Sequence, residues 1–351
     1  MQCGLFCTAQ AGTADHPPET GKGFHDYLDL NIEAEALGYC SSFLVEHHFS
    51  GWNQVSATLT LLTCLAMRTT RLRVGSSVMV LPWHNPVLLA EQVAMIDVMS
   101  GGRLDLGIGK GYRYNEFLGF NIPQEEADAR FEEALAVITR AWTSRERFTH
   151  QGKFWTFNDI VVEPPPAQKP HPPFWVAAGS EPSIKRAAAR GFRLILDQYA
   201  SPAEIGRRIA IYRAELEAHG RVYDPTHVTV ARQLYVAKDR ADKEAALERQ
   251  AVNNERMAAV SRWPDKKVGS HILGYADKAG GTTENAMFGT PDEIRETLTA
   301  LQQAGAEFLI FAMAGGREHL RRFAREIMPG FSKAPAATPG DHRAAIAPTL
   351  A

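Results

Sequence analysis

Residues 72–111 read LRVGSSVMVLPWHNPVLLAEQVAMIDVMSGGRLDLGIGKG and contain the repeating unit on which the fold prediction depends. Residues 72–80 and 103–106 are rich in apolar and β-branched side chains, which is typical of buried strands. Between them, residues 87–99 have the apolar spacing of a helix. A strand, a helix and a second strand in this order predict one unit of a parallel α/β sheet, with a right-handed crossover that places the helix outside.

The same alternation continues along the chain. Further strands are predicted at residues 2–7, 42–45, 174–178, 193–196, 228–236 and 307–313, and further helices at 24–37, 55–67 and 125–142. Ser201 and Thr290 each precede a proline and a glutamate three residues on, which predicts two later helix starts. Eight strands alternating with helices predict a (β/α)8 (TIM) barrel, while a doubly wound open sheet is the alternative that the count leaves open.

Composition excludes several classes of protein. Hydrophobic residues make up 45% of the 351 and charged residues 22%, as in a globular protein with a large core. Lys plus Arg is 38 and Asp plus Glu is 40, and this balance argues against nucleic-acid and membrane-surface partners. The cysteines (Cys3, Cys7, Cys40 and Cys64) form no CxxC pair, so we expect reduced core thiols in a cytoplasmic protein and no zinc site.

Uneven spacing of the strands predicts insertions in one barrel domain, residues 1–331. Residues 143–173 contain a proline-rich surface connection, and residues 250–286 are polar and have the length of a lid or a disordered loop. Residues 332–351, rich in Ala and Pro, are predicted to be a disordered tail.

Glu46, His47 and His48 close the second predicted strand, where barrel enzymes place catalytic groups. Strand alternation sends Glu46 and His48 to one side and His47 to the other. A neutral imidazole can transfer a proton, and a neighbouring carboxylate can fix its tautomer, although a purely structural strand end fits equally well. Adjacent histidines are poorly spaced as metal ligands and no HExxH motif occurs, so no metal site is expected.

Three further segments have features of an anion site. Lys110 lies in a glycine-rich loop at residues 107–111, which is neither GxGxxG nor a Walker A motif, and Arg130 begins the next strong helix. Gly179, Ser180 and Ser183 lie in a turn that opens a helix, where free amides and hydroxyls bind anions; simple helix capping by Ser180 is the alternative. Together these groups could hold one phosphate.

Small residues Ser76 and Ser77 interrupt an apolar strand and leave room for a flat ring, or for tight packing against a helix. Phe6, Trp83 and Tyr112 lie near strand ends and are candidates for pocket lining, although such residues are more often simple core.

Four stretches of the sequence carry a family resemblance. LVEHHF (44–49), VGSSVMVLPWHNP (74–86), EQVAMIDVMSGGRLDLGIGKG (91–111) and FGTPDEI (288–294) resemble the bacterial luciferase-like flavin-dependent monooxygenases. The resemblance extends from residue 2 to about residue 329 and is closest to the luciferase α-subunit.

The resemblance implies a barrel that binds reduced FMN, which reacts with O2 to a flavin C4a-hydroperoxide that oxidises a small organic substrate. His47 is similar to the catalytic histidine, with Glu46 and His48 beside it. Lys110 stands where luciferase has a phosphate-binding arginine, and Gly109 where it has a reactive cysteine. Arg130 resembles the second phosphate arginine, and Ser180 and Ser183 the hydroxyl ligands.

The family also has a non-prolyl cis peptide beneath the flavin, which would fall at Ser77–Val78, and a mobile lid in the place of residues 250–286. It further implies a separate flavin reductase as partner and a homodimer. Two alternatives stay open: an F420-dependent dehydrogenase or reductase of the same superfamily, and a non-catalytic flavin-binding protein. The substrate cannot be deduced from one sequence.

Overall fold

The computed structural model describes residues 1–264 and 271–332, in which eight parallel strands close into a barrel. Around the ring, each strand pairs with the next in the order β1 (Gln2–Cys7), β2 (Ser41–Leu44), β3 (Arg73–Ser76), β5 (Leu104–Gly109), β8 (Phe174–Ala177), β9 (Arg193–Leu196), β10 (Val228–Val236) and β12 (Phe308–Met313). The last strand pairs with the first, and the parallel register of Gln2 with Phe308 closes the ring. The predicted (β/α)8 barrel is confirmed, and the open sheet is excluded.

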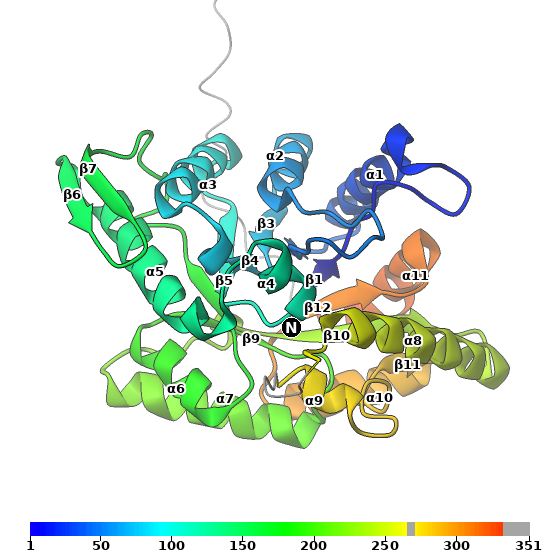
Figure 1. Ribbon diagram of the computed structural model, residues 1–351. Helices are drawn as coiled ribbons and strands as arrows, with labels where there is room; N and C mark the ends of the chain where they lie inside the picture. Colours follow the sequence, from blue (N-terminus) through cyan, green and yellow to red (C-terminus); the bar gives the residue numbers. More distant parts are fainter. Residues whose placement is uncertain (265–270, 333–351) are drawn as a thin grey trace, which may run out of the picture.

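Helices surround the barrel, as the right-handed crossovers predict (Figure 1). Their bounds are α1 (Lys22–Ala36), α2 (Thr58–Arg68), α3 (Pro86–Ser100), α4 (Tyr114–Gly119), α5 (Ala127–Thr143), α6 (Glu181–Ala189), α7 (Pro202–Ala218), α8 (Arg240–Ser261), α9 (Leu273–Ala276), α10 (Pro291–Gln303) and α11 (Gly316–Arg322), with a π-helical turn at Phe323–Ile327. Ser201 caps α7, and Thr290 forms a reciprocal capping box with Glu293 at α10, so both predicted helix starts are confirmed.

The segment predicted as one strand over residues 72–80 is two strands. β3 ends at Ser76, a cis peptide joins Ser77 to Val78, and β4 (Met79–Val80) then pairs with the far end of β5. The cis peptide expected from the resemblance is therefore present at its expected position.

The first predicted insertion contains an antiparallel hairpin of β6 (Phe148–Gln151) and β7 (Thr156–Ile160). In the second, predicted as a lid or loop over residues 250–286, the end of α8 occupies the first residues up to Ser261, α9 lies further along, and β11 (Met287–Gly289) follows the segment. Residues 265–270 of this segment, and the predicted tail beyond residue 332, lie outside the described residues. The assignment of residues 1–331 to one domain stays a prediction.

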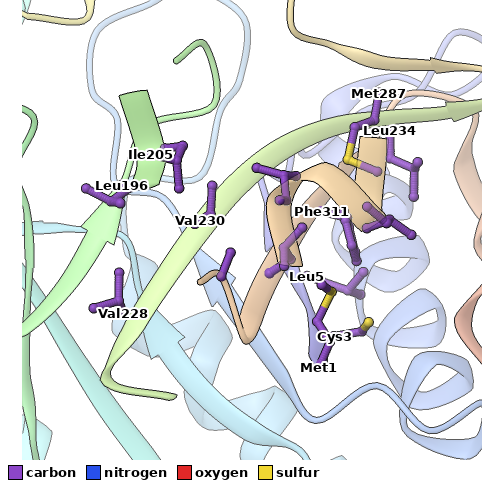
Figure 2. Packing of buried hydrophobic residues seen from close by; sticks show 14 of the residues in the cluster. Met1, Cys3, Leu5, Leu196, Ile205, Val228, Val230, Leu234, Met287 and Phe311 are labelled. Atoms are coloured by element: carbon purple, nitrogen blue, oxygen red, sulfur yellow. The ribbon is translucent and has the colours of Figure 1, made fainter. Parts of the chain in front are cut away.

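The core has an inner and an outer part. Inside the barrel, Phe43, Trp175 and Phe308 pack ring against ring, with centroids 5.5 Å apart for the first pair and 5.9 Å for the second. Between barrel and helices, Leu5, Val230 and Phe311 belong to a large apolar cluster (Figure 2). This packing fills the barrel, so a ligand site has to lie at its mouth.

The cysteines are all free, but one prediction about them is wrong. Cys3 is buried, whereas Cys64 is exposed on α2 and is not a core residue. In the described part of the chain, no helix is long and apolar enough to cross a membrane.

Candidate active site at the carboxyl end of the barrel

Glu46 is the centre of a hydrogen-bonded cluster just beyond the end of β2. Its carboxylate accepts from His84 Nε2 at 2.7 Å and from His48 Nε2 at 3.1 Å through one oxygen, and from the Val80 amide at 2.7 Å through the other. Glu46 is 2% exposed, and strand alternation does place it on the same side as His48. The cluster therefore ties the end of β2 to β4 and to the loop before α3.

His47 points to a different carboxylate. Its Nδ1 lies 3.0 Å from Glu116 Oε1, and the same oxygen accepts from the His48 amide at 2.9 Å. Glu116 is carried by α4, which Figure 1 shows over the central part of the barrel end, and it is 2% exposed. Because an ionised carboxylate can only accept, Nδ1 carries the proton and Nε2 of His47 is left as an acceptor.

Burial and charge set the protonation states of the two groups. Burial lowers the pKa of His47, the positive charge of Arg113 lowers it further, and the bond to Glu116 opposes them. Burial alone would raise the pKa of Glu46, but the hydrogen bonds from His48 and His84 outweigh it and bring this pKa below its usual value. Both shifts favour a neutral His47 imidazole and an ionised Glu46 carboxylate at neutral pH.

Aromatic rings form a wall around His48. Trp83 meets the His48 ring edge-on at 5.6 Å and stacks on Phe120 at 5.3 Å, and Phe120 approaches His48 at 4.8 Å. The Nε1 donor of Trp83 is buried, with no acceptor among the described residues. Trp83 therefore lies beside His48, which agrees with the prediction that it lines a pocket. Phe6, in contrast, packs against the inner barrel cluster.

The small residues at the end of β3 serve packing between strands. Ser76 is fully buried and donates to the Gly107 carbonyl at 2.8 Å, so its hydroxyl is already engaged. A Cβ on Gly107 would lie 1.9 Å from the Ser76 carbonyl oxygen, and one on Gly109 2.6 Å from Val78. These glycines are therefore required by the approach of β5 to the cis-peptide segment. Ser77 and Val78 stay half-buried beside them.

Lys110 and Arg130 come close to the same helix start. Lys110 pairs with Asp128 at 2.6 Å, and Arg130 lies two residues further along α5, where it pairs with Glu126 at 2.9 Å and covers the Phe154 ring at 4.4 Å. Within residues 1–264 and 271–332, no hydrogen bond or ion pair links either cation to the serine turn.

The turn at Gly179–Ser183 differs from a simple helix cap. Ser180 is the N-cap residue of α6, but its hydroxyl makes no capping bond; it lies 2.9 Å from the Ser183 hydroxyl. The alternative that Ser180 merely caps the helix is thus wrong, and amides at the start of α6 stay without a side-chain cap. The His271 ring fills the space beside Gly179, 2.2 Å from where a Cβ would stand.

Sequence reasoning missed two members of the site. Glu116 and His84 are the direct partners of His47 and Glu46, yet they come from α4 and from the loop before α3. The sequence offered one signal for each residue: Glu116 lies shortly after the glycine-rich loop, and His84 directly follows Trp83. No set of three or more His, Cys, Asp or Glu side chains in the described part is placed to hold a metal ion.

Comparisons with known proteins give this site a context. The chain matches the family model described as luciferase-like monooxygenase over residues 1–307. It is 25% identical to the oxygenase component of the flavin-dependent trigonelline monooxygenase of Acinetobacter baylyi, over 90% of this chain and 92% of that protein. It is also 28% identical to an F420-dependent glucose-6-phosphate dehydrogenase of Kineococcus radiotolerans, over 86% and 91%.

Among solved structures, the monooxygenase RslO1 of Streptomyces bottropensis superposes with a TM-score of 0.80 and 27% identity, over 95% of this chain and all of that one. Two further relatives, both from Sinorhizobium fredii, are matched over only 61% and 60% of their length.

Proposed function

Because this chain belongs to the luciferase-like monooxygenase family, we propose that it is the oxygenase of a two-component system, using reduced FMN and O2 to oxidise a small organic substrate. The observation that carries the proposal is the His47–Glu116 pair beside the Glu46 cluster at the mouth of the barrel. This pair supports the proposal because it would supply one proton-transfer group, with a fixed tautomer, in the region where barrel enzymes bind their ligands.

The residues at the mouth fit the phosphate of FMN. The uncapped start of α6, with the hydroxyls of Ser180 and Ser183, offers donors to an anion. Lys110 and Arg130 would add positive charge by giving up their surface partners Asp128 and Glu126. Such exposed or half-exposed ion pairs contribute only about 0–1 kcal/mol, so the exchange costs little. The half-buried Ser77 and Val78 would lie under the ring, with the fully buried Ser76 behind them.

When bound, reduced FMN supplies the electrons that activate O2. The protein's part is to hold or move a proton: His47 Nε2 accepts it, while Glu116 keeps the ring oriented through Nδ1. Glu46 and His48 act as positioning residues, since the Glu46 carboxylate accepts from both His48 and His84. The oxygen chemistry expected on the flavin stays a prediction.

The partners that the family resemblance implies belong to the same proposal. A separate reductase would supply reduced FMN. A homodimer is supported by an apolar outer face on two adjacent helices, where Met67, Leu88, Met95 and Met99 are between 42% and 56% exposed. A second copy of this chain would cover this face. A cytoplasmic location stays a prediction.

One other function has a specific observation in its favour. The F420-dependent relative matches 86% of the chain, so hydride transfer with F420 is the second candidate. Non-catalytic flavin binding is the remaining alternative.

Oxygen uptake with the two reduced cofactors separates the candidates. We expect reduced FMN, titrated anaerobically, to bind the protein, and on mixing with O2 to reoxidise at a rate different from free flavin. His47→Gln should leave the binding of FMN unchanged and alter the reoxidation. Binding of reduced F420 without binding of FMN would favour hydride transfer. Reoxidation at the free-flavin rate would leave only the binding role.

A further inference from the structure

Arg113 is a buried cation at the mouth of the barrel, and two of its nitrogens have no hydrogen-bond partner in the part of the chain that the structure describes. It follows β5 by four residues and precedes α4, and it is 2% exposed. Its Nε and Nη1 are shielded from solvent and find no acceptor among the described residues. A guanidinium stays charged at every physiological pH, so donors left in this state cost free energy unless a ligand accepts them.

The fold satisfies its other deeply buried arginines with its own atoms. Arg208, 2% exposed, pairs with Asp197 at 2.6 Å and with Glu204 at 2.8 Å. Arg232, 1% exposed, donates to the carbonyls of three residues: Asp197, Ala200 and Ala231. Arg113 is therefore the exception among the three buried arginines of residues 1–264 and 271–332.

Two buried acids of the site already have partners. Glu116, three residues on, accepts from His47 and from the His48 amide, and Glu46 accepts from two histidines and the Val80 amide. The charge of Arg113 is felt at His47, whose pKa it lowers after burial has lowered it first. The unpartnered donors thus lie beside the proton-transfer group and have no carboxylate of their own.

Aromatic side chains lie along the segment that carries Arg113. Its Cζ lies 5.9 Å from the centroid of the Tyr112 ring. A Cβ on Gly111, two residues before it, would stand 3.0 Å from Trp83 and 3.3 Å from Phe117. Trp263 donates to the Tyr112 carbonyl at 3.3 Å and lies 6.0 Å from Phe117. Flat apolar walls next to a planar cation suit a small aromatic acid.

We propose that Arg113 is a specificity-determining residue that binds the carboxylate of an aromatic acid substrate beside His47. The inference rests on the proposed function, since the acid would be the molecule that is oxidised. A guanidinium pairs with a carboxylate through two parallel hydrogen bonds, one from Nη2 and one from either Nε or Nη1. The acid would therefore satisfy one of the two orphan donors, and the paired bonds would fix the orientation of its ring. The same oxyanion chemistry could come from the phosphate of FMN, so the test has to separate the two sources.

Binding of benzoate and of neutral benzamide is measured by calorimetry on the full chain, with and without FMN. We expect benzoate to bind at least about tenfold more tightly, because its bonds to Arg113 are charge-assisted. Arg113→Gln should abolish this preference, and Arg113→Lys should restore part of it as a point charge. Arg140→Gln, on the outer surface of α5, is the control and should keep the full preference.

A competition experiment and a stability measurement can each overturn the proposal. Loss of the preference in Arg130→Gln, or competition between benzoate and inorganic phosphate, would move the anion to the phosphate site and overturn the proposal. A large loss of unfolding free energy in Arg113→Gln would show a structural arginine and also overturn it; we expect stability to be kept or raised, because an unpaired buried charge is removed. Benzoate should raise the melting temperature of the wild type and not that of Arg113→Gln.

Failure of this proposal is distinguishable from failure of the proposed function. If FMN binds and oxygen uptake is altered but benzoate and benzamide bind alike, only the substrate class is wrong. If benzoate is preferred but neither reduced FMN nor oxygen uptake responds, the site binds acids and the oxygenase function is wrong.

Discussion

Replacing Glu116 with Gln tests the hydrogen-bonded pair on which the proposed proton transfer depends. Gln keeps the shape and an acceptor oxygen but removes the negative charge 3.0 Å from His47 Nδ1. In the structure, Glu116 opposes the lowering of the His47 pKa that burial and Arg113 cause. Without this charge, the pKa of His47 should fall further, and the imidazole should protonate only at lower pH.

The magnitude follows from the two bonds that Glu116 accepts, from His47 and from the His48 amide at 2.9 Å. Hydrogen bonds to a charged group contribute about 1.5–3 kcal/mol and neutral ones about 0.5–1.5 kcal/mol, so each bond loses about 1 kcal/mol. Both together give about 2 kcal/mol as an upper value, since the variant no longer has to bury a carboxylate. We expect a modest fall in unfolding free energy within this limit.

The assay is a histidine titration by NMR, with the His47 signal assigned from its absence in His47→Gln. Glu133→Gln is the matched control, because Glu133 on α5 pairs with His150 of the β6–β7 hairpin at 3.2 Å, and no described hydrogen bond or ion pair links it to His47. It should leave the His47 titration unchanged. An unchanged or raised pKa of His47 in Glu116→Gln would refute the pairing and the tautomer deduced from it.

Three further predictions concern stability. Thr290→Ala removes the capping box of α10 and should lower the unfolding free energy by about 1 kcal/mol in urea titrations; no change would mean that the reciprocal bonds with Glu293 contribute nothing. Gly107→Ala should lower the unfolding free energy by about 1–3 kcal/mol or prevent folding, because the new Cβ would stand 1.9 Å from the Ser76 carbonyl oxygen. The control Gly274→Ala should be nearly neutral, because its Cβ would meet open space. Equal effects of the two substitutions would contradict the close packing of β3 and β5. The pKa values of His47 and His319 are lower in the folded protein than in the unfolded chain, so the unfolded chain binds more protons in acid. The unfolding free energy should therefore fall as the pH drops below about 6.5, and it should fall less steeply in His47→Gln. Equal slopes for the wild type and the variant would contradict a His47 that is buried in its neutral form.

The sequence predicted the barrel well because its signals are local. The apolar runs, the helical periodicity and the caps at Ser201 and Thr290 each depend on neighbours in the chain, and the structure has these elements within a few residues of their predicted bounds. The strand over residues 72–80 was predicted too long, because the apolar residues on both sides of Ser76 and Ser77 fit a single strand even though these small residues interrupt it.

The partners within the site could not be predicted from the chain alone. Glu116 reaches His47 across 69 positions of sequence, and His84 reaches Glu46 across 38. Such pairings depend on how the loops after three strands meet at the mouth. The unpartnered state of Arg113 likewise becomes visible only once every neighbouring acid has been accounted for.

Affinity for reduced FMN compared with reduced riboflavin is the most direct test of the cofactor assignment. If the serine turn, Lys110 and Arg130 hold the phosphate, the wild type should bind reduced FMN at least about tenfold more tightly than reduced riboflavin. One hydrogen bond to the charged phosphate is enough for a difference of this size. A double Ser180→Ala, Ser183→Ala variant should lose part of that difference while keeping its riboflavin affinity. Equal affinities for the two flavins in the wild type would contradict the assignment.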